Sequence, residues 1–482
     1  MSVLNQYEPK KVFQFFEEIC GIPHGSGNVE KISNYLVNFA KERNLKVRQD
    51  ESYNVIIWKD ASVGYEASAP VILQGHMDMV AVKEADCTKN METEGLDLEV
   101  QGEFLSARKT SLGGDDGIAV AYALAILDDD NIAHPPIEAI FTVDEEVGML
   151  GATALDTSDL KGKTMLNIDS EEEGVFTVSC AGGATVKCNL PYRKELISAA
   201  IIEMRMDGFT GGHSGIEIDK DRLNANQVLG RILLNVFQKV GMRLVVIGGG
   251  EKDNAIADFS EVAMAVNTEA IDTTKKIIED TFAEIKKEHQ LSDPDVKLQL
   301  NVMPEDMVES FSGAATLATV VSLANMPGGV QRMNPEVPGM VQTSLNLGIL
   351  KTEVEQVQMV FSVRSSVESE KNFLIEKLKS MTEIFGGNVT IEGNYPGWEY
   401  KADSKLREVM VDAYRQVYGK EPIVEGVHAG LECGIFASKI PGLDAVSFGP
   451  QMNNIHTTNE ELNIPSVERT WKLILKTLEM LK

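Results

Sequence analysis

The chain has 482 residues, of which 45 are Lys or Arg and 73 are Asp or Glu, so its formal net charge is −28. This acidity disfavours binding to nucleic acid or to an anionic membrane surface, because both interactions need clustered basic side chains. The chain is also longer than one hydrophobic core usually supports, so we expect two or more domains.

The N-terminal segment and the cysteines favour a cytoplasmic protein. Glu8, Glu17 and Glu18 fall where a secretory signal needs an apolar core. No apolar run approaches the roughly 20 residues of a membrane helix. The 5 cysteines are scattered and form no CxxC pair, which favours reduced thiols over a disulfide framework.

Helical and strand-like patterns alternate in the first third of the chain and again near its end. The predicted helices span residues 10–19, 29–43, 118–127, 405–418 and 467–480, and the predicted strands span residues 54–58, 70–74, 137–143, 164–168 and 445–448. Strands separated by helices indicate an α/β fold with a mixed, largely parallel sheet.

The middle of the chain has a different pattern. Predicted strands at residues 199–206, 243–247, 261–266 and 358–363 are separated by long predicted helices at residues 225–240, 273–288 and 371–384. This order favours an α+β domain with antiparallel strands, inserted into the first domain. We therefore expect one domain formed by residues 1–185 and 388–482, with residues 186–387 as the insert.

A His-Met-Asp triplet follows the predicted strand at residues 70–74. Positions two apart on a strand face the same side, so Asp78 can accept a hydrogen bond from the ring nitrogen of His76 that does not bind metal. Taken alone, such a pair is more often an ordinary surface or strand-end pair.

Residues 111–117 form a glycine-rich turn that holds Asp115 and Asp116 just before an Ala-rich helix. Glycine suits the unusual backbone angles of a tight turn. No GK[ST] follows and the two carboxylates would repel phosphate, so the turn suits a cation better. The alternative is that an Asp simply caps the helix.

Three further segments carry acidic or imidazole groups. Glu145 and Glu146 follow the predicted strand at 137–143, Asp169 ends the strand at 164–168, and His456 lies in a polar loop near the C-terminus. Adjacent carboxylates can divide their roles, one binding metal and the other moving protons. The alternative for each of these residues is a solvated loop position.

Together these side chains indicate a dinuclear metal site. All the candidate ligands offer nitrogen or oxygen, and the early ones follow strands, whose carboxyl ends carry the sites of open α/β sheets. Such ligands suit Zn²⁺, with Mn²⁺ or Co²⁺ as substitutes. Three carboxylates and a hydroxide would also neutralise two divalent cations, which avoids burying unbalanced charge. The candidate ligands are His76, Asp115, Glu146, Asp169 and His456.

Six motifs in this order closely resemble those of the aminoacyl-histidine dipeptidases, also called Xaa-His or cytosolic non-specific dipeptidases. The motifs are HMD (76–78), GGDDG (113–117), DEEVG (144–148), NIDSEEEG (167–174), GGHSG (211–215) and NNIHTT (453–458). This family belongs to the di-zinc clan that includes carboxypeptidase G and acetylornithine deacetylase. The resemblance covers nearly the whole chain and implies an α/β catalytic domain of the di-zinc exopeptidase type with an inserted α+β lid domain.

The resemblance also implies how the candidate ligands share two zinc ions. His76 and Asp169 would hold one ion and Glu146 and His456 the other, with Asp115 bridging them.

The resemblance implies roles for the neighbouring acids as well. Asp78 would orient His76, and Glu145 would be the general base that takes a proton from the attacking water. A non-proline cis peptide is implied after Asp115. Asp116 departs from the family pattern, which often has Asn there.

The resemblance also implies that three residues of the insert contact the substrate. His213 would stabilise the oxyanion, and Arg364 matches an Arg that binds the substrate carboxylate in related dipeptidases. Asn254 is a weaker match for another lid contact. The alternatives are turn residues for His213 and Asn254 and a surface salt bridge for Arg364.

The size of the insert predicts how His213 reaches a site. In dimeric members of the clan a smaller lid supplies its His to the partner's site, whereas related dipeptidases carry a doubled lid within one chain. We therefore predict that His213 serves the site of its own chain. This leaves open whether the protein is a homodimer.

The favoured function is a zinc-dependent dipeptidase that hydrolyses unblocked dipeptides, Xaa-His among them. An N-acyl-amino-acid deacylase or a tripeptide aminopeptidase of the same clan is the alternative, because it would share the metal ligands. A non-catalytic binding protein is disfavoured, since all ligands and the base are present. A nucleotide-binding oxidoreductase is disfavoured too, because no GxGxxG joins a strand to a helix.

Overall fold

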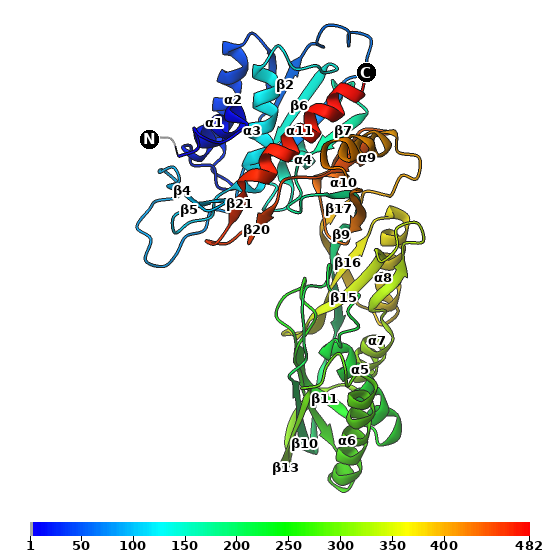
Figure 1. The fold of residues 1–482 in the computed structure, drawn as a ribbon. Helices are drawn as coiled ribbons and strands as arrows, with labels where there is room; N and C mark the ends of the chain where they lie inside the picture. Colours follow the sequence, from blue (N-terminus) through cyan, green and yellow to red (C-terminus); the bar gives the residue numbers. More distant parts are fainter. Residues whose placement is uncertain (1–2) are drawn as a thin grey trace. The chain divides into compact units, whose positions relative to one another are not determined.

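The computed structural model describes residues 3–482, which separate into two compact units. The first unit contains the described residues up to Ser179 together with Tyr400–Gly426 and Leu431–Lys482, and the second contains Cys180–Glu399 and Val427–Gly430 (Figure 1). The predicted insert, residues 186–387, begins and ends inside the second unit.

Main-chain pairing explains why the second unit extends beyond the predicted bounds. The amide of Cys180 donates to the carbonyl of Trp398 at 3.1 Å, and the amide of Trp398 donates back at 2.9 Å. The amide of Ala181 donates to the carbonyls of Val427 and Ala429, at 3.2 and 3.0 Å. Because these bonds join residues far apart in the sequence, no local pattern marks them.

A mixed β-sheet forms the centre of the first unit. In spatial order its strands are β1 (Lys46–Gln49), β2 (Val55–Lys59), β6 (Ile137–Thr142), β3 (Val71–His76), β7 (Thr164–Asn167), β19 (Asp444–Ser447), β8 (Val175–Cys180) and β18 (Ile423–Val427). The pairs β3/β6, β3/β7 and β7/β19 are parallel, whereas β1/β2, β2/β6 and β8/β19 are antiparallel. This arrangement confirms the predicted mixed α/β sheet.

The helices of the first unit pack on this sheet and on one another. They are α1 (Lys10–Cys20), α2 (Glu30–Glu42), α3 (Gly114–Asp128), α4 (Leu150–Ala154), α9 (Lys405–Tyr418), α10 (Glu432–Lys439) and α11 (Ile464–Met480). Helix α3 is buried from Gly114 to Leu127, which explains why its sequence from Gly117 to Leu127 has no charged residue and no polar face. Within residues 3–482, no helix combines the length and the apolar composition needed to cross a membrane.

A small antiparallel sheet also belongs to the first unit. In spatial order its strands are β20 (Met452–Asn453), β21 (Glu461–Asn463), β5 (Phe104–Ala107) and β4 (Leu98–Gln101). The loop between β20 and β21 contains His456. Pairing of β21 with β5 therefore anchors this C-terminal loop to an early part of the chain.

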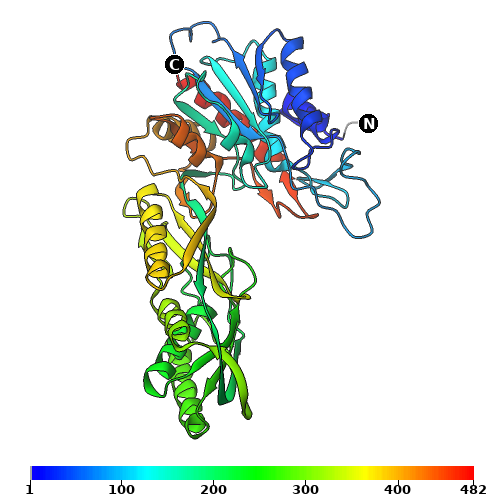
Figure 2. The same ribbon diagram turned by 180° about the vertical axis from the view of Figure 1, so that it is seen from behind.

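An antiparallel sheet forms the second unit, and its long helices lie along one face of that sheet (Figures 1 and 2). In spatial order the strands are β13 (Lys297–Phe311), β10 (Lys194–Asp207), β12 (Ser260–Val266), β11 (Arg243–Gly249), β15 (Val341–Thr352), β16 (Gln356–Ser365), β9 (Gly182–Pro191) and β17 (Asn388–Tyr395), with β14 (Gly329–Met333) paired to β15. The helices are α5 (Ala225–Lys239), the short η1 (Thr268–Ala270), α6 (Ile271–Glu288), α7 (Gly313–Asn325) and α8 (Glu368–Ile384). This confirms the predicted α+β character.

The sequence analysis does not predict strands β9, β13, β14, β15 and β17 or helix α7 of the second unit, and β13 and α7 show why. Strand β13 lies at a sheet edge and is exposed at most of its positions, so burial imposes no alternation on its residues. Helix α7 has the sequence GAATLATVVSLAN, whose small and apolar residues give little contrast between its faces. A helical period is hard to recognise without that contrast.

Candidate active site

The predicted site residues of the first unit lie where its parallel strands end. His76 is the last residue of β3, Glu145 and Glu146 follow β6, and Asp169 follows β7. Strand β3 pairs in parallel with both β6 and β7. The carboxyl ends of these strands therefore meet at one edge, which is where open α/β sheets carry their sites.

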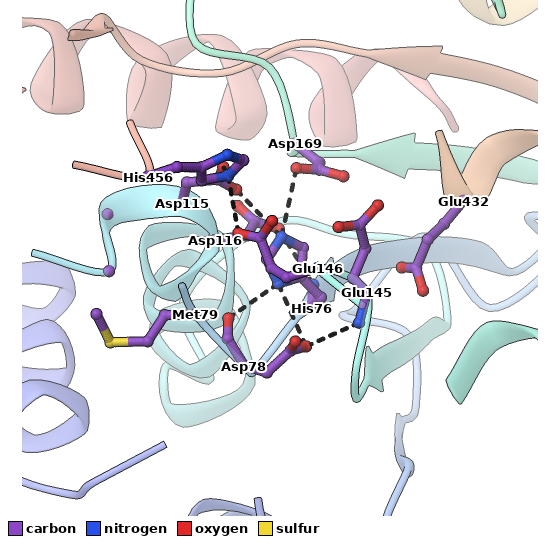
Figure 3. A network of polar contacts seen from close by, with 12 residues as sticks. His76, Asp78, Met79, Asp115, Asp116, Glu145, Glu146, Asp169, Glu432 and His456 are labelled. Carbon is purple, nitrogen blue, oxygen red and sulfur yellow. Dashed lines mark hydrogen bonds and ion pairs between the residues drawn. The ribbon is translucent and has the colours of Figure 1, made fainter. Parts of the chain in front are cut away.

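The two remaining candidate ligands come from elsewhere in the chain. Asp115 lies in the first turn of α3, and His456 lies in the loop between β20 and β21. Figure 3 shows both side chains beside the strand-end residues. The structure thus brings together all the side chains that the sequence offers as metal ligands.

The Asp115 carboxylate lies between the two histidines. Its Oδ1 is 3.1 Å from Nε2 of His76, and its Oδ2 is 3.0 Å from Nε2 of His456. Asp169 Oδ1 is 3.7 Å from the same nitrogen of His76, and Glu146 Oε1 is 2.9 Å from the same nitrogen of His456. Each histidine therefore has its own carboxylate and shares Asp115 with the other.

The donor atoms are close enough to hold metal ions. Three groups of side chains each have donor atoms within 4.8 Å of one another: His76, Asp116 and Asp169; His76, Glu145 and Glu146; and Asp115, Glu146 and His456. Imidazole nitrogen and carboxylate oxygen are ligands that Zn²⁺ and Mn²⁺ accept. The residues present thus fit divalent cations.

Burial and mutual repulsion perturb the acids at this site. Burial raises the pKa of Glu145 to about 7, with Glu146 and Asp115 adding to the rise and His76 opposing it. Burial likewise raises the pKa of Asp169, again with the Asp115 carboxylate adding. Such crowding of buried negative charge is unfavourable without compensating cations.

The carboxylate contacts favour the charged form of His456, whereas burial disfavours the charged form of the acids. Hydrogen bonds with Asp115 and Glu146 raise the pKa of His456 to about 10. For Asp115, burial is opposed by hydrogen bonds with His456 and His76, which lower its pKa below the usual range. Both histidines therefore face negatively charged carboxylates.

Asp78 is fully buried and contacts both His76 and the segment that carries Glu145. The ring Nδ1 of His76 lies 3.0 Å from the Asp78 carbonyl oxygen and 3.5 Å from Asp78 Oδ1. The same Oδ1 accepts the backbone N–H of Glu145 at 3.1 Å, and Oδ2 accepts the hydroxyl of Ser26 at 2.8 Å. A donor bond from Nδ1 leaves Nε2 of His76 free as a ligand.

The peptide bond between Asp115 and Asp116 is cis, which confirms the implication of the family resemblance. Asp116 is fully buried, and its Oδ2 accepts the backbone N–H of His76 at 3.2 Å. Burial raises the pKa of Asp116, and the charge of Asp169 adds to the rise. Asp116 therefore supports the backbone of one candidate ligand.

Glu432 is a buried acid of this site that the sequence does not single out. Its Oε2 accepts from Gln74 Nε2 and from Thr142 Oγ1, both at 2.6 Å. Burial raises the pKa of Glu432 to about 8, with Glu145 adding to the rise. Figure 3 shows Glu432 beside Glu145. A single Glu at the start of a helix carries no motif, so only the fold reveals this contact.

His213 belongs to the second unit, and its backbone pairs with that of Ala255. The imidazole Nδ1 accepts the backbone N–H groups of Gly215 and Ile216, at 3.1 and 3.2 Å. Burial lowers the pKa of His213, and the Arg364 guanidinium adds to this. Because Nδ1 accepts two backbone N–H groups, the ring proton lies on Nε2, which makes that atom a hydrogen-bond donor.

Arg364 also lies in the second unit, on β16. Its Nη1 donates to Tyr395 Oη at 3.3 Å. Burial lowers the pKa of His428 to about 3, and Arg364 contributes to this shift. His428 Nε2 forms a hydrogen bond with Ser344 Oγ at 2.7 Å. The positive charge of Arg364 thus acts on the rings of both His213 and His428.

Asn254, the third predicted substrate contact, is exposed. Its carbonyl oxygen accepts the backbone N–H of Ser214 at 2.9 Å, directly beside His213. The three predicted substrate contacts therefore all belong to the second unit, whereas the metal-donor groups belong to the first.

The family profile and the relative that match this chain both describe peptidases. The sequence profile of peptidase family M20/M25/M40 matches residues 72–480. The chain is 35% identical over 483 residues to the cytosol non-specific dipeptidase of Escherichia coli strain K12, with 99% of each sequence covered.

Two solved peptidase structures are similar to the structure of this chain. The crystal structure of aminoacylhistidine dipeptidase from Vibrio alginolyticus matches with a TM-score of 0.95 and 35% identity, covering 99% of this chain and 98% of that one. The aminopeptidase PepT from Bacillus cereus shares the fold, with a TM-score of 0.57 at 17% identity over 98% of this chain and 99% of that one.

Proposed function

The chain belongs to peptidase family M20/M25/M40, and from this premise we propose that it is a zinc-dependent dipeptidase acting on unblocked dipeptides, Xaa-His among them. The observation that carries the proposal is the Asp115 carboxylate, whose two oxygens face His76 and His456 at 3.1 and 3.0 Å. The names of the relatives, a non-specific dipeptidase and an aminoacylhistidine dipeptidase, support the substrate class.

Asp115 and four neighbouring side chains would hold two divalent cations. His76 and Asp169 would hold one, and His456 and Glu146 the other, as the pairwise contacts indicate. Zinc suits this mixture of imidazole and carboxylate, and Mn²⁺ or Co²⁺ are the proposed substitutes. When bound, such ions supply a water of lowered pKa and polarise the scissile carbonyl.

Glu145 is the proposed general base. Glu145 is next to Glu146 in the sequence, but the carboxylate that contacts His456 is that of Glu146. The bond between the Glu145 backbone N–H and Asp78 fixes the position of the residue. Glu145 would accept a proton from the attacking water at its carboxylate and deliver it to the nitrogen of the leaving amine.

His213 and Arg364 are the proposed substrate contacts of the second unit. The Nε2–H of His213 is available because two backbone amides occupy Nδ1. That donor would stabilise the oxyanion that forms at the scissile carbonyl. The Arg364 guanidinium would pair with the substrate's C-terminal carboxylate, which its planar geometry suits. Asn254 would add a polar contact to the same substrate.

A substrate panel tests the proposed function. Free dipeptides, N-acetylated dipeptides and tripeptides would be compared, each with and without a metal chelator. We expect the free dipeptides to be hydrolysed fastest and the chelator to stop the reaction. Preferential cleavage of N-acetylated substrates would favour a deacylase, and preferential cleavage of tripeptides would favour a tripeptide aminopeptidase.

The cellular location is proposed to be the cytosol, in line with the name of the Escherichia coli relative. Cell fractionation of the native organism with an antibody to the chain tests this. Recovery of the protein with secreted or membrane material would contradict it.

A further inference from the structure

The carboxylate of Glu460 accepts the N–H groups of four consecutive residues. Its Oε2 accepts from Leu112 at 2.7 Å and from Gly113 at 3.0 Å, and its Oε1 accepts from Gly114 at 2.8 Å and from Asp115 at 3.3 Å. Only 2% of Glu460 is exposed. Both carboxylate oxygens are thus fully engaged by the backbone of one turn.

This turn leads directly into the residue that faces both histidines. Gly113 has a φ of 68° and precedes helix α3, and Asp115 lies in the first turn of that helix. Leu112 and Gly113 precede the helix, and Asp115 and Asp116 have non-helical backbone angles. A regular helix therefore does not satisfy these four amides, and the Glu460 carboxylate does so instead. The Glu460 carboxylate therefore holds the backbone from Leu112 to Asp115 through four hydrogen bonds.

Glu460 is also part of the loop that carries His456. The loop between β20 and β21 places Asn454 and His456 at φ values of 52° and 61°, where residues other than glycine are uncommon. Contacts within the loop hold this conformation: the Thr457 hydroxyl donates to the Asn454 carbonyl at 2.7 Å, and the Glu460 amide donates to the Thr457 carbonyl at 3.3 Å. One end of Glu460 thus belongs to the His456 loop, and the other holds the Asp115 turn.

We propose that Glu460 is a positioning residue that holds the Asp115 turn and the His456 loop in register, so that both can ligate the same metal ion. The proposal rests on the proposed function, because it takes Asp115 and His456 as metal ligands. It assigns Glu460 no contact with substrate. Its effect is transmitted through the four backbone amides and through the short stretch of chain between Glu460 and His456.

The variant Glu460→Gln tests this with little change in shape. A Gln side chain has a single acceptor oxygen, and its NH₂ group would face two backbone donors. The matched control is Glu138→Gln. Glu138 is 3% exposed and accepts the amides of Lys161 and Gly162, at 2.9 to 3.1 Å. It lies near the start of β6, at the opposite end from the site.

The measurement is metal binding by the full chain. Each protein is stripped with chelator and titrated with Zn²⁺, and the Co²⁺-substituted forms are compared by visible absorption. Thermal unfolding of the stripped proteins reports stability alone. We expect Glu460→Gln to lose affinity for one of two ions by about 10- to 100-fold, as for other groups that orient ligands, and to alter the Co²⁺ spectrum. Glu138→Gln should bind both ions as the unmodified protein does.

Unchanged affinity for both ions in Glu460→Gln would overturn the proposal. So would an equal loss of affinity in Glu138→Gln, because the effect would then be one of general stability. If Glu460→Gln does not fold, Glu460→Asp keeps the charge and shortens the reach, and it should weaken the same ion. Failure of the unmodified protein to bind two ions would instead contradict the proposed function.

Discussion

Asp78 and Glu145 are joined by a hydrogen bond of 3.1 Å from the Glu145 backbone nitrogen to Asp78 Oδ1. Asp78 also faces Nδ1 of His76. One buried carboxylate therefore links the proposed general base to a proposed metal ligand. Substitution of Asp78 should therefore affect the site, although Asp78 belongs to none of the three metal-donor groups.

Replacing Asp78 with Asn is expected to weaken both metal binding and turnover. The Asn oxygen can still accept the Glu145 amide, but the negative charge beside Nδ1 of His76 is lost. Loss of such an orienting group typically costs about 10- to 100-fold in metal affinity or activity. Zinc titration and kcat measured at saturating metal would show this. Ser26→Ala, which removes the bond to Asp78 Oδ2 and a longer contact of 3.5 Å with the Met79 carbonyl, should have a much smaller effect.

Replacing Glu145 with Gln is expected to separate proton transfer from metal binding. The side chain keeps its size but cannot accept a proton, so kcat should fall by about 10²- to 10⁴-fold. Both metal ions should remain bound. Asp115→Ala and Glu146→Ala should instead lower the metal content found by elemental analysis. A metal-free Glu145→Gln protein would show that the roles of the two glutamates are reversed.

Removing the metal is expected to abolish hydrolysis. The donor groups contain only imidazole nitrogen and carboxylate oxygen, so Zn²⁺, Mn²⁺ or Co²⁺ should each restore activity after chelation. Dialysis against chelator, elemental analysis and stepwise addition of each metal would show how many ions per chain are required. Full activity in a demonstrably metal-free preparation would falsify this prediction.

Replacing Arg364 with Lys is expected to weaken recognition of the substrate carboxylate. Lys retains the charge but not the paired N–H groups. Loss of one hydrogen bond to a charged group, worth about 1.5–3 kcal/mol, should raise KM by roughly 10- to 100-fold. Dipeptide amides, which have no terminal carboxylate, serve as the comparison substrates. Equal effects on acids and amides would argue against carboxylate binding by Arg364.

His213 is expected to serve the site of its own chain. Inactive Glu145→Gln chains would be mixed with inactive His213→Ala chains after subunit exchange has been demonstrated by labelling. Action within one chain predicts no recovery, because every chain lacks one essential group. Activity well above that of either variant alone would show that His213 acts on a partner's site, and the dipeptidase function would still stand.

The types of candidate metal ligand and the fold class can be predicted from the sequence, because neighbouring residues carry the signals for both. His76, Glu146 and Asp169 each stand at or just after a short apolar run, and parallel strands bring their carboxyl ends to one edge of a sheet. Polar residues at such positions are thus visible as neighbours of strands. Glycines 113 and 114 beside Asp115 mark the turn in the same local way.

Only the tertiary structure shows which contacts set the positions of these side chains. Glu460 contacts Leu112, 348 positions away in the sequence, and Glu432 contacts Gln74, 358 positions away. Neither glutamate belongs to a periodic pattern, because its partners are backbone amides or side chains brought close by folding. The pairing of Cys180 with Trp398 sets the limits of the second unit for the same reason. Local sequence thus determined which groups could bind metal, whereas long-range hydrogen bonds determined their orientation.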